Sequence, residues 1–440
     1  MITDTNKALA QWAMEYALKN GCQASRVTIY NGSNSSFEVR DMKIDRLQQA
    51  SENSMIIQLF IDGRYGSFST NRINRNELES FIRNGIDTTR LLAEDQARSL
   101  PEASLYFKGE NDKDLQLMDP EFDHINPDDK LSIAMNACEE MMGKDNRIVS
   151  TNSSYSDGKI YKYIIASNGF EGLSENSYFS LTASLSIKGE GDARPESYWY
   201  DSSLYLNSLM KKGIGTQALE RVLKKLGQKK IASGRYQLLV DNLNSSNLLS
   251  PVMDALAGSS IQQKDSFLID KLNQQVFCPR MTLTDTPHLA KAAGARYFDN
   301  EGVATAEIPV FSEGILKNYY IDTYNANKMK VKQTISSPSL LTMKMGAKNK
   351  EELITSVDKG ILVTGFNGGN CNSSTGDFSY GIEGFLIEKG KITQPVSEMN
   401  VTGNMIDLWN NLVEIGNDPL LSSRWRIPSL LFDNVDFSGL

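Results

Sequence analysis

The sequence contains very little histidine: only His124 and His288 occur among its 440 residues. His124 lies in the polar stretch EFDHINPDD, and His288 lies in TDTPHLAK, which resembles the start of a helix. A zinc hydrolase usually takes two or three of its ligands from histidine. We therefore interpret both histidines as surface or capping residues rather than as metal ligands.

Cysteine is also sparse, and its spacing argues against two further classes of protein. The chain has Cys22, Cys138, Cys278 and Cys371, which are far apart and form no CxxC pair. Neither a disulfide framework nor a thiolate zinc cluster is indicated. The sequence lacks an apolar run of about 18 residues, which a membrane-spanning helix needs, and it lacks the apolar segment of a signal peptide. We expect a cytoplasmic protein with reduced thiols and no membrane contact.

A clustered basic face is missing as well. The formal net charge is −8, and lysine and arginine are dispersed except at 211–212 and 224–230. Contacts to nucleic-acid phosphates require grouped basic side chains, so nucleic acid is not expected as a ligand. The hydrophobic content of 40% and the charged content of 23% are ordinary for a folded protein.

Apolar periodicity predicts an α+β fold in three parts. Residues 1–104 form an N-terminal α/β unit, and residues 105–231 combine a helix with an antiparallel meander after a charged loop over 108–116. Residues 232–440 form a mainly antiparallel β domain with short helices. Helices are expected over 5–20, 76–93, 128–142, 215–230 and 244–258.

The stretch GFNGGNCNSSTGDFSYGIEGFLIE, from Gly365 to Glu388, raises the main chemical question. A phosphate cradle needs glycines that open a helix, but FSYGIEGFLIE alternates as a strand and no GK[ST] is present. A nucleophilic Cys371 would need a nearby histidine, and the chain has few. We interpret 365–377 as a loop that uses glycine for positive φ and Asn or Asp for bonds to the local backbone.

Asp299 and Glu301 form a second candidate for a chemical site, because these carboxylates stand two residues apart before a strand. Paired carboxylates suit acid–base work or a cation site. The sequence Asp-Asn-Glu-Gly is also ordinary turn chemistry, and we favour the turn.

Several segments resemble the C-terminal domain of the TldD/PmbA family. In chain order they are FDNEGVAT, FSEGILKNYYIDTYNANKM, STGDFSYGIEGFLIEKGKITQPVSEMNVTGNM and PSLLFDNVDFSG. IDGRYGSFST and IASNGFEG resemble the same family, so the similarity spans nearly the whole chain. In that family two related subunits form a heterodimeric metallopeptidase, and the TldD type binds zinc through an HExxxH helix and a cysteine near the C-terminus. The family is linked to maturation of a microcin, to degradation of an unfolded antitoxin and to an older label, modulator of DNA gyrase.

The resemblance identifies this chain as the TldE (PmbA) type, because the zinc motif is degenerate. By position after the strand RYQLLVDN, Ser250 replaces the first His, Pro251 the Glu and Ala255 the second His. Hydroxyl and methyl groups do not replace imidazole, and proline cannot act as a general base. Pro251 suits the first turn of a helix, where a missing N–H costs little. No cysteine follows Cys371, so we expect no catalytic residue and no metal ligand in this chain.

The predicted function is that of a non-catalytic subunit of a cytoplasmic zinc metallopeptidase heterodimer that acts on unfolded or extended peptides. The resemblance implies a TldD-like HExxxH partner that carries the zinc, no cofactor on this chain and a homodimer when the chain is alone. Strands of the C-terminal domain would offer free edges to an extended peptide. The wall expected to face peptide or partner comprises Asn300, Glu301, Asn367, Asn370 and Asp377.

Two alternatives stay open. The chain could be a regulatory interaction protein without a proteolytic role, such as a modulator of DNA gyrase, or an independent enzyme that uses Asp, Ser or Cys371. Recovery of an HExxxH-bearing relative in a pull-down would separate the main prediction from the first alternative. Activity of the purified chain that persists in chelator would support the second.

Overall fold

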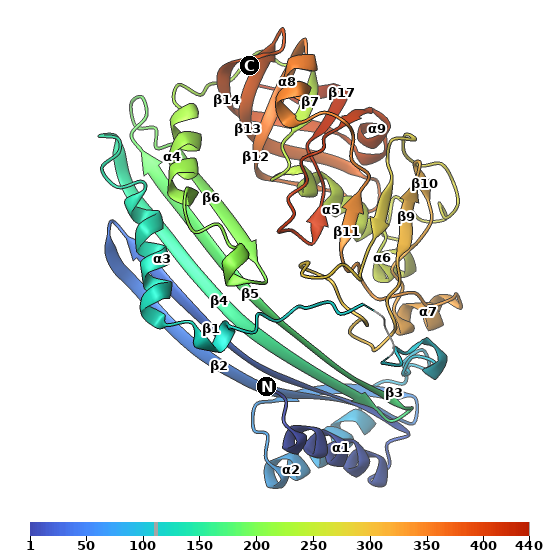
Figure 1. The fold of residues 1–440 in the computed structure, drawn as a ribbon. Coiled ribbons are helices and arrows are strands. Elements are labelled where there is room, and N and C mark those ends of the chain that lie inside the picture. The colour runs from blue at the N-terminus through green and yellow to red at the C-terminus, as the bar shows by residue number, and fades with distance from the viewer. Residues whose placement is uncertain (110–112, 440) are drawn as a thin grey trace.

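A computed structural model describes residues 1–109 and 113–439 of the chain. A long curved sheet lies opposite a β-rich C-terminal part (Figure 1). Mixed helices and antiparallel sheets confirm the predicted α+β class. The charged loop predicted over 108–116 includes residues 110–112, which lie outside the described residues.

One antiparallel sheet joins the first and central parts of the chain. It comprises β1 (Ala24–Arg40), β2 (Lys43–Ile61), β3 (Arg64–Thr70), β4 (Ile148–Ala166), β5 (Phe170–Ile187) and β6 (Glu196–Ser203). The strand order is β3-β2-β1-β4-β5-β6. β1 and β4 pair without a register shift, from Arg26 opposite Ala166 to Arg40 opposite Asn152. Strands from residues 1–104 and 105–231 therefore share one hydrogen-bonded layer.

Helices cover one side of this sheet in two places. They are α1 (Asp4–Lys19), α2 (Arg75–Arg90), α3 (Pro127–Glu139) and α4 (Ile214–Lys224), with single 3-10 turns at Ala103–Leu105, Phe122–His124 and Leu206–Ser208. Odd-numbered residues of β4 pack under helices. Tyr163 belongs to the hydrophobic core that α1 covers, and Tyr155 belongs to the hydrophobic core that α3 and α4 cover. Successive side chains of a strand point to opposite faces, so even-numbered residues such as Lys162 face away from the helices.

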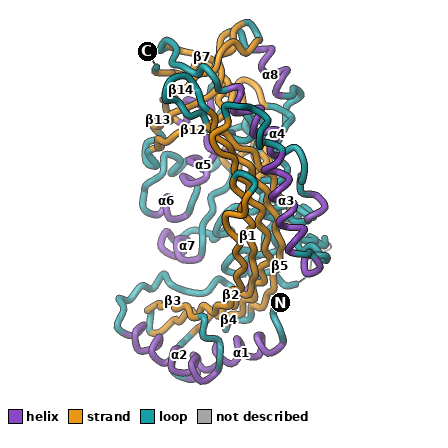
Figure 2. The backbone as a smooth tube through the Cα atoms, turned by 90° about the vertical axis from the view of Figure 1, so that its left-hand side faces the viewer, coloured by secondary structure: helices purple, strands orange, loops and turns teal. Residues whose placement is uncertain are grey.

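The predicted helices over 5–20, 76–93 and 128–142 are confirmed within a few residues by α1, α2 and α3. In the perpendicular view the sheet separates α3 and α4 from α5, α6 and α7 (Figure 2). α4 ends at Lys224, earlier than predicted, because Gly227 adopts a φ of 74°. No helix within the described residues has the length and apolar character needed to cross a membrane.

The main strands of the C-terminal part close into a barrel. They are β7 (Gly234–Val240), β12 (Lys359–Cys371), β13 (Asp377–Glu388), β14 (Lys391–Asn404) and β17 (Leu430–Ser438), with β15 (Leu412–Ile415) beside β17. The order is β14-β13-β12-β7-β17, and β14 pairs again with β17 at Asn400–Thr402. Closure removes strand edges. Here the second pairing of β14 covers only three residues, and the small sheet of this part stays open, so the offer of strand edges to a peptide stays a prediction.

Short elements surround the barrel. The strands β8 (Leu283–Asp285), β9 (Ile308–Ser312), β10 (Ile315–Leu316), β11 (Leu341–Met343) and β16 (Trp425–Arg426) form a small second sheet. The helices are α5 (Ser245–Ala255), α6 (Gly258–Gln262), α7 (Thr323–Met329), α8 (Lys350–Ser356) and α9 (Met405–Asn410). Leu248 of α5 and Trp409 of α9 are fully buried in one core with Leu238 of β7 and Phe277, which fixes α5 against the barrel.

Candidate functional site

The positions of the degenerate zinc motif lie beside a cavity of about 400 Å³. α5 contributes Asn247, Ser250, Pro251 and Asp254 to its wall, at the three- and four-residue spacing of one helix face. The rest of the wall comprises Phe366, Gly368, Gly369, Asn370, Cys371, Ser373 and Tyr380. The motif helix and the glycine-rich stretch, more than 100 residues apart in sequence, thus meet at one site.

Pro251 lies inside α5 and not in its first turn, so the predicted placement was wrong. The helix begins at Ser245, because the N–H groups of Asn244 and Ser245 both donate to the carbonyl of Asp241 at 2.9 Å. At this interior position proline offers no N–H to the carbonyl of Asn247, one turn earlier. The proline therefore weakens the helix at the cavity wall.

Ala255 faces the core and does not line the cavity. Its exposed fraction is 0%. Residues five apart on a helix differ by about 140° in direction, whereas residues four apart lie nearly in line. Asp254, and not Ala255, therefore shares the cavity-facing side of α5 with Ser250.

The donor atoms at this cavity do not fit a zinc ion. The wall offers one carboxylate (Asp254), one thiol (Cys371), and the hydroxyl and amide groups of Asn247, Ser250, Asn370, Ser373 and Tyr380; no histidine stands among the described residues of the wall. Burial, aided by the carboxylates of Asp377 and Asp254, raises the pKa of Cys371 to about 11. Zinc binding requires deprotonated thiols and neutral imidazoles. The site thus lacks the ligand set of a zinc peptidase.

The two histidines lie at other places. His124 is exposed, and its Nδ1 lies 3.2 Å from a carboxylate oxygen of Glu121. Nε2 of His288 lies 3.0 Å from the hydroxyl of Thr305, and burial lowers the pKa of this imidazole. His288 stands in a turn, not at the start of a helix. Neither histidine lines the cavity beside α5.

Of the loop predicted over 365–377, residues up to Cys371 belong to β12, and only residues 372–376 form a turn. β12 continues to Cys371, and its pairing with β13 has two register shifts, the second just before Gly369. A Cβ at Gly369 would lie 2.1 Å from the carbonyl oxygen of Ser379, and its φ is 100°. The glycines thus permit β-bulges. The turn itself is short, and the side chain of Asn372 accepts its N–H groups.

The structure separates the residues predicted to face peptide or partner. Asn370 lines the cavity beside α5, whereas Asn300 lines a different cavity. Asn367 is exposed on β12. Asp377 accepts hydrogen bonds from Thr375 and Asn404 next to the β12–β13 turn. A contact of these residues with peptide or partner stays a prediction.

Asp299 and Glu301 build the turn that the sequence indicates. Asp299 accepts the N–H groups of Glu301 and Val303 at 2.8 and 3.0 Å. The carboxylate of Glu301 accepts the N–H and the hydroxyl of Thr323 at 2.9 Å. Both carboxylates are thus engaged in holding local structure, and a role of Glu301 toward peptide or partner stays a prediction.

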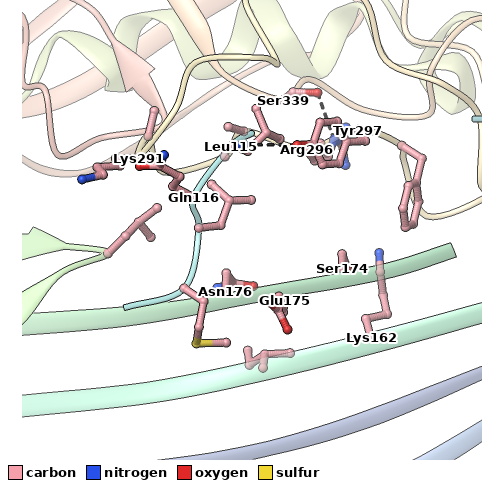
Figure 3. Close-up of a pocket in the computed structure, with 18 of the residues that line it drawn as sticks. Leu115, Gln116, Lys162, Ser174, Glu175, Asn176, Lys291, Arg296, Tyr297 and Ser339 are labelled. Atoms are coloured by element: carbon pink, nitrogen blue, oxygen red, sulfur yellow. Dashed lines mark hydrogen bonds between the residues drawn. The ribbon is translucent and has the colours of Figure 1, made fainter. Parts of the chain in front are cut away.

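A larger cavity, of about 1050 Å³, lies between the long sheet and the C-terminal part (Figure 3). β4 and β5 form its floor, and the opposite wall carries Lys291, Arg296 and Tyr297. The sequence analysis missed this site because its residues come from distant segments without a motif. One local signal existed. Lys162 lies between apolar and aromatic residues in KIYKYIIAS, which is part of a strand.

The long helix-covered sheet, the barrel and the motif helix beside a cavity have the domain arrangement of a metallopeptidase-type family. Models of the PmbA/TldA metallopeptidase domain 1, central domain and C-terminal domain match residues 27–89, 120–226 and 233–439. The chain belongs to the PmbA/TldD family.

Three relatives illustrate this membership. A crystal structure from Bacteroides thetaiotaomicron, described as a candidate modulator of DNA gyrase, is 63% identical, covers 100% of both chains and has a TM-score of 0.98. The metalloprotease PmbA of Escherichia coli O157:H7 is 25% identical over 94% of this chain and 92% of that protein. TldE from Thermococcus kodakarensis shares the fold, with a TM-score of 0.84 at 18% identity over 98% of this chain and 99% of that chain.

Proposed function

We propose that this chain is the non-catalytic, TldE-like subunit of a cytoplasmic zinc metallopeptidase heterodimer. The observation that carries the proposal is the wall of the cavity beside α5. Ser250 and Pro251 occupy the cavity-facing motif positions, and the pKa of the neighbouring Cys371 is raised to about 11. A chain with these groups would leave zinc binding and water activation to a related HExxxH-bearing subunit.

In this proposal the chain completes the chamber through which an unfolded or extended peptide reaches the zinc of its partner. Pairing of β14 with β17 occupies the edge of β14 only at Asn400–Thr402. The larger cavity, between the sheet and the C-terminal part, offers a further surface to the peptide. Alone, the chain would form a homodimer through the surface that the partner covers in the heterodimer, because related subunits share one shape.

The test combines metal analysis with a peptidase assay. We expect the purified chain to bind no stoichiometric zinc and to cleave no unfolded peptide. Addition of an HExxxH-bearing relative should produce cleavage that a chelator abolishes. The matched control is the same relative with its motif Glu replaced by Gln, which should assemble but not cleave. Stoichiometric zinc on this chain alone, or cleavage by it alone, would overturn the proposal.

The description of the Bacteroides relative favours one second candidate, a modulator of DNA gyrase. A pull-down from the native cell separates the two candidates. Recovery of an HExxxH-bearing relative supports the peptidase subunit, whereas recovery of gyrase without such a relative supports the modulator.

A further inference from the structure

The larger cavity contains a group of cations that form no close ion pair with a carboxylate of the described residues. Lys162, Lys291, Arg296 and Arg424 line it. Within residues 1–109 and 113–439, none of the four has a carboxylate oxygen within 4.0 Å, although many other cations of the chain do. In a chain of net charge −8, this group is a local excess of positive charge.

Lys162 is the cation on the floor of the cavity. It projects from β4 toward the wall that carries Arg296 (Figure 3). Its ammonium donates a hydrogen bond to the side-chain oxygen of Asn300 at 3.1 Å and lies 5.7 Å from the ring centroid of Phe298. Burial, with a contribution from the charge of Arg296, lowers the pKa of Lys162 to about 8. A partly buried cation without a counterion costs stability, so an anionic ligand would relieve this cost.

Arg296 is held rigidly on the opposite wall. Its Nε donates to the hydroxyl of Ser339 at 2.9 Å, and one terminal nitrogen donates to the carbonyl of Ser337 at 2.6 Å. The charges of Asp285 and Asp299 favour the guanidinium, but both carboxylates are occupied by backbone N–H groups. A fixed guanidinium without a paired carboxylate is arranged for planar anions such as carboxylates.

The rest of the cavity combines apolar and acidic groups. Ile160 and Leu173 line it with exposed fractions of 41% and 42%, which is high for large apolar side chains. Asp114 and Glu175 also line it and would repel a continuous run of phosphates. Isolated carboxylates flanked by apolar side chains fit this lining better than nucleic acid does.

We propose that this cavity binds an acidic peptide segment, whose carboxylates contact Lys162 and Arg296 while neighbouring apolar side chains cover Ile160 and Leu173. The inference names a substrate class for the proposed peptide-handling function and rests on it. Binding needs neither the partner subunit nor cleavage, so a failure of this inference can be told from a failure of the proposed function.

The test measures binding of fluorescent extended peptides to the full chain by polarisation in chelator. One peptide alternates Leu and Glu, and its control has Gln at every Glu. We expect the acidic peptide to bind at least about tenfold more tightly than the amide peptide. Lys162→Met should remove most of this difference, whereas Lys332→Met, at an exposed position outside the cavity, should preserve it.

A second readout locates the bound peptide. Acetylation of Lys162 by acetic anhydride, followed by mass spectrometry, should slow several-fold when the acidic peptide is present and should not change with the amide peptide. Lys291→Met gives an independent variant. The side chain of Lys291 is exposed, and its ammonium lies over the ring of Tyr205, which also lines the cavity. Equal binding of both peptides, tighter binding of a single-stranded oligonucleotide, or unaltered acetylation of Lys162 would overturn the proposal.

Discussion

Replacing Lys162 by methionine should stabilise the protein while weakening its affinity for an acidic peptide. Burial lowers the pKa of this lysine from 10.5 to about 8, which corresponds to a cost of about 3 kcal/mol for the charged amine in the folded state. Methionine also loses the hydrogen bond that Lys162 donates to Asn300, which costs about 1 kcal/mol. Methionine has a similar length and no charge. We expect Lys162→Met to raise the free energy of unfolding by about 2 kcal/mol at pH 7.

The effect should depend on pH with a defined sign. Below pH 8 the amine of Lys162 is charged in both the folded and the unfolded chain, so the full cost applies. Between pH 8 and 10.5 the unfolded chain keeps a proton that the folded chain has lost, and the stability of the wild type rises with pH. The stability difference between Lys162→Met and the wild type should therefore shrink across this interval.

Thermal unfolding, followed by circular dichroism at pH 7 and pH 10, checks this expectation. At pH 7 the midpoint of Lys162→Met should exceed that of the wild type by about 2 °C. Lys332→Met, at an exposed position, serves as the control and should shift the midpoint little. A lower midpoint for Lys162→Met at pH 7, or the same shift at both pH values, would refute the reasoning.

Three further changes test other parts of the structure. Asp157, only 1% exposed, pairs with Lys130 at 2.6 Å. Asp157→Asn should therefore lower the free energy of unfolding by about 3 kcal/mol. A smaller loss when Lys130→Met is added would confirm that the unpaired cation is the cause. Pro251→Ala restores an N–H inside α5 and should raise the free energy of unfolding by about 1 kcal/mol, without any gain of zinc; a lower melting midpoint would contradict this. Cys371, with a pKa of about 11, should react with iodoacetamide at pH 7 about a hundredfold more slowly than an unfolded thiol. Peptide mass spectrometry measures the two rates, and equal rates would contradict the raised pKa of Cys371.

The sequence predicts the fold where local patterns decide it. Ala10, Ala13 and Ala17 recur at helical spacing and form the buried face of α1, so the helix follows from periodicity. The pairing of Arg26 with Ala166 joins residues 140 apart, and no local pattern encodes it. The barrel contact between β14 and β17 pairs Asn400 with Ser438 and Thr402 with Asp436; these separations are shorter, but no local pattern encodes them either.

The candidate site was predictable only in part. Resemblance to a family locates Ser250, and the structure brings it to the same cavity wall as Asn370, one of the residues predicted to face peptide or partner. Pro251 was misplaced because α5 begins earlier than its first turn was predicted to, at the carbonyl of Asp241. The cationic cavity was missed because Lys162 and Arg296 meet only through tertiary packing.

The uninterrupted ladder between β1 and β4 bears on how the molecule can be dissected. Fifteen residue pairs connect these strands, from Arg26 to Arg40 along β1. A fragment ending near residue 104 would leave this whole row of N–H and C=O groups bare, and such an edge promotes aggregation. Limited proteolysis should accordingly liberate the segment after residue 231 as a unit, whereas the first 231 residues should resist separation and unfold together.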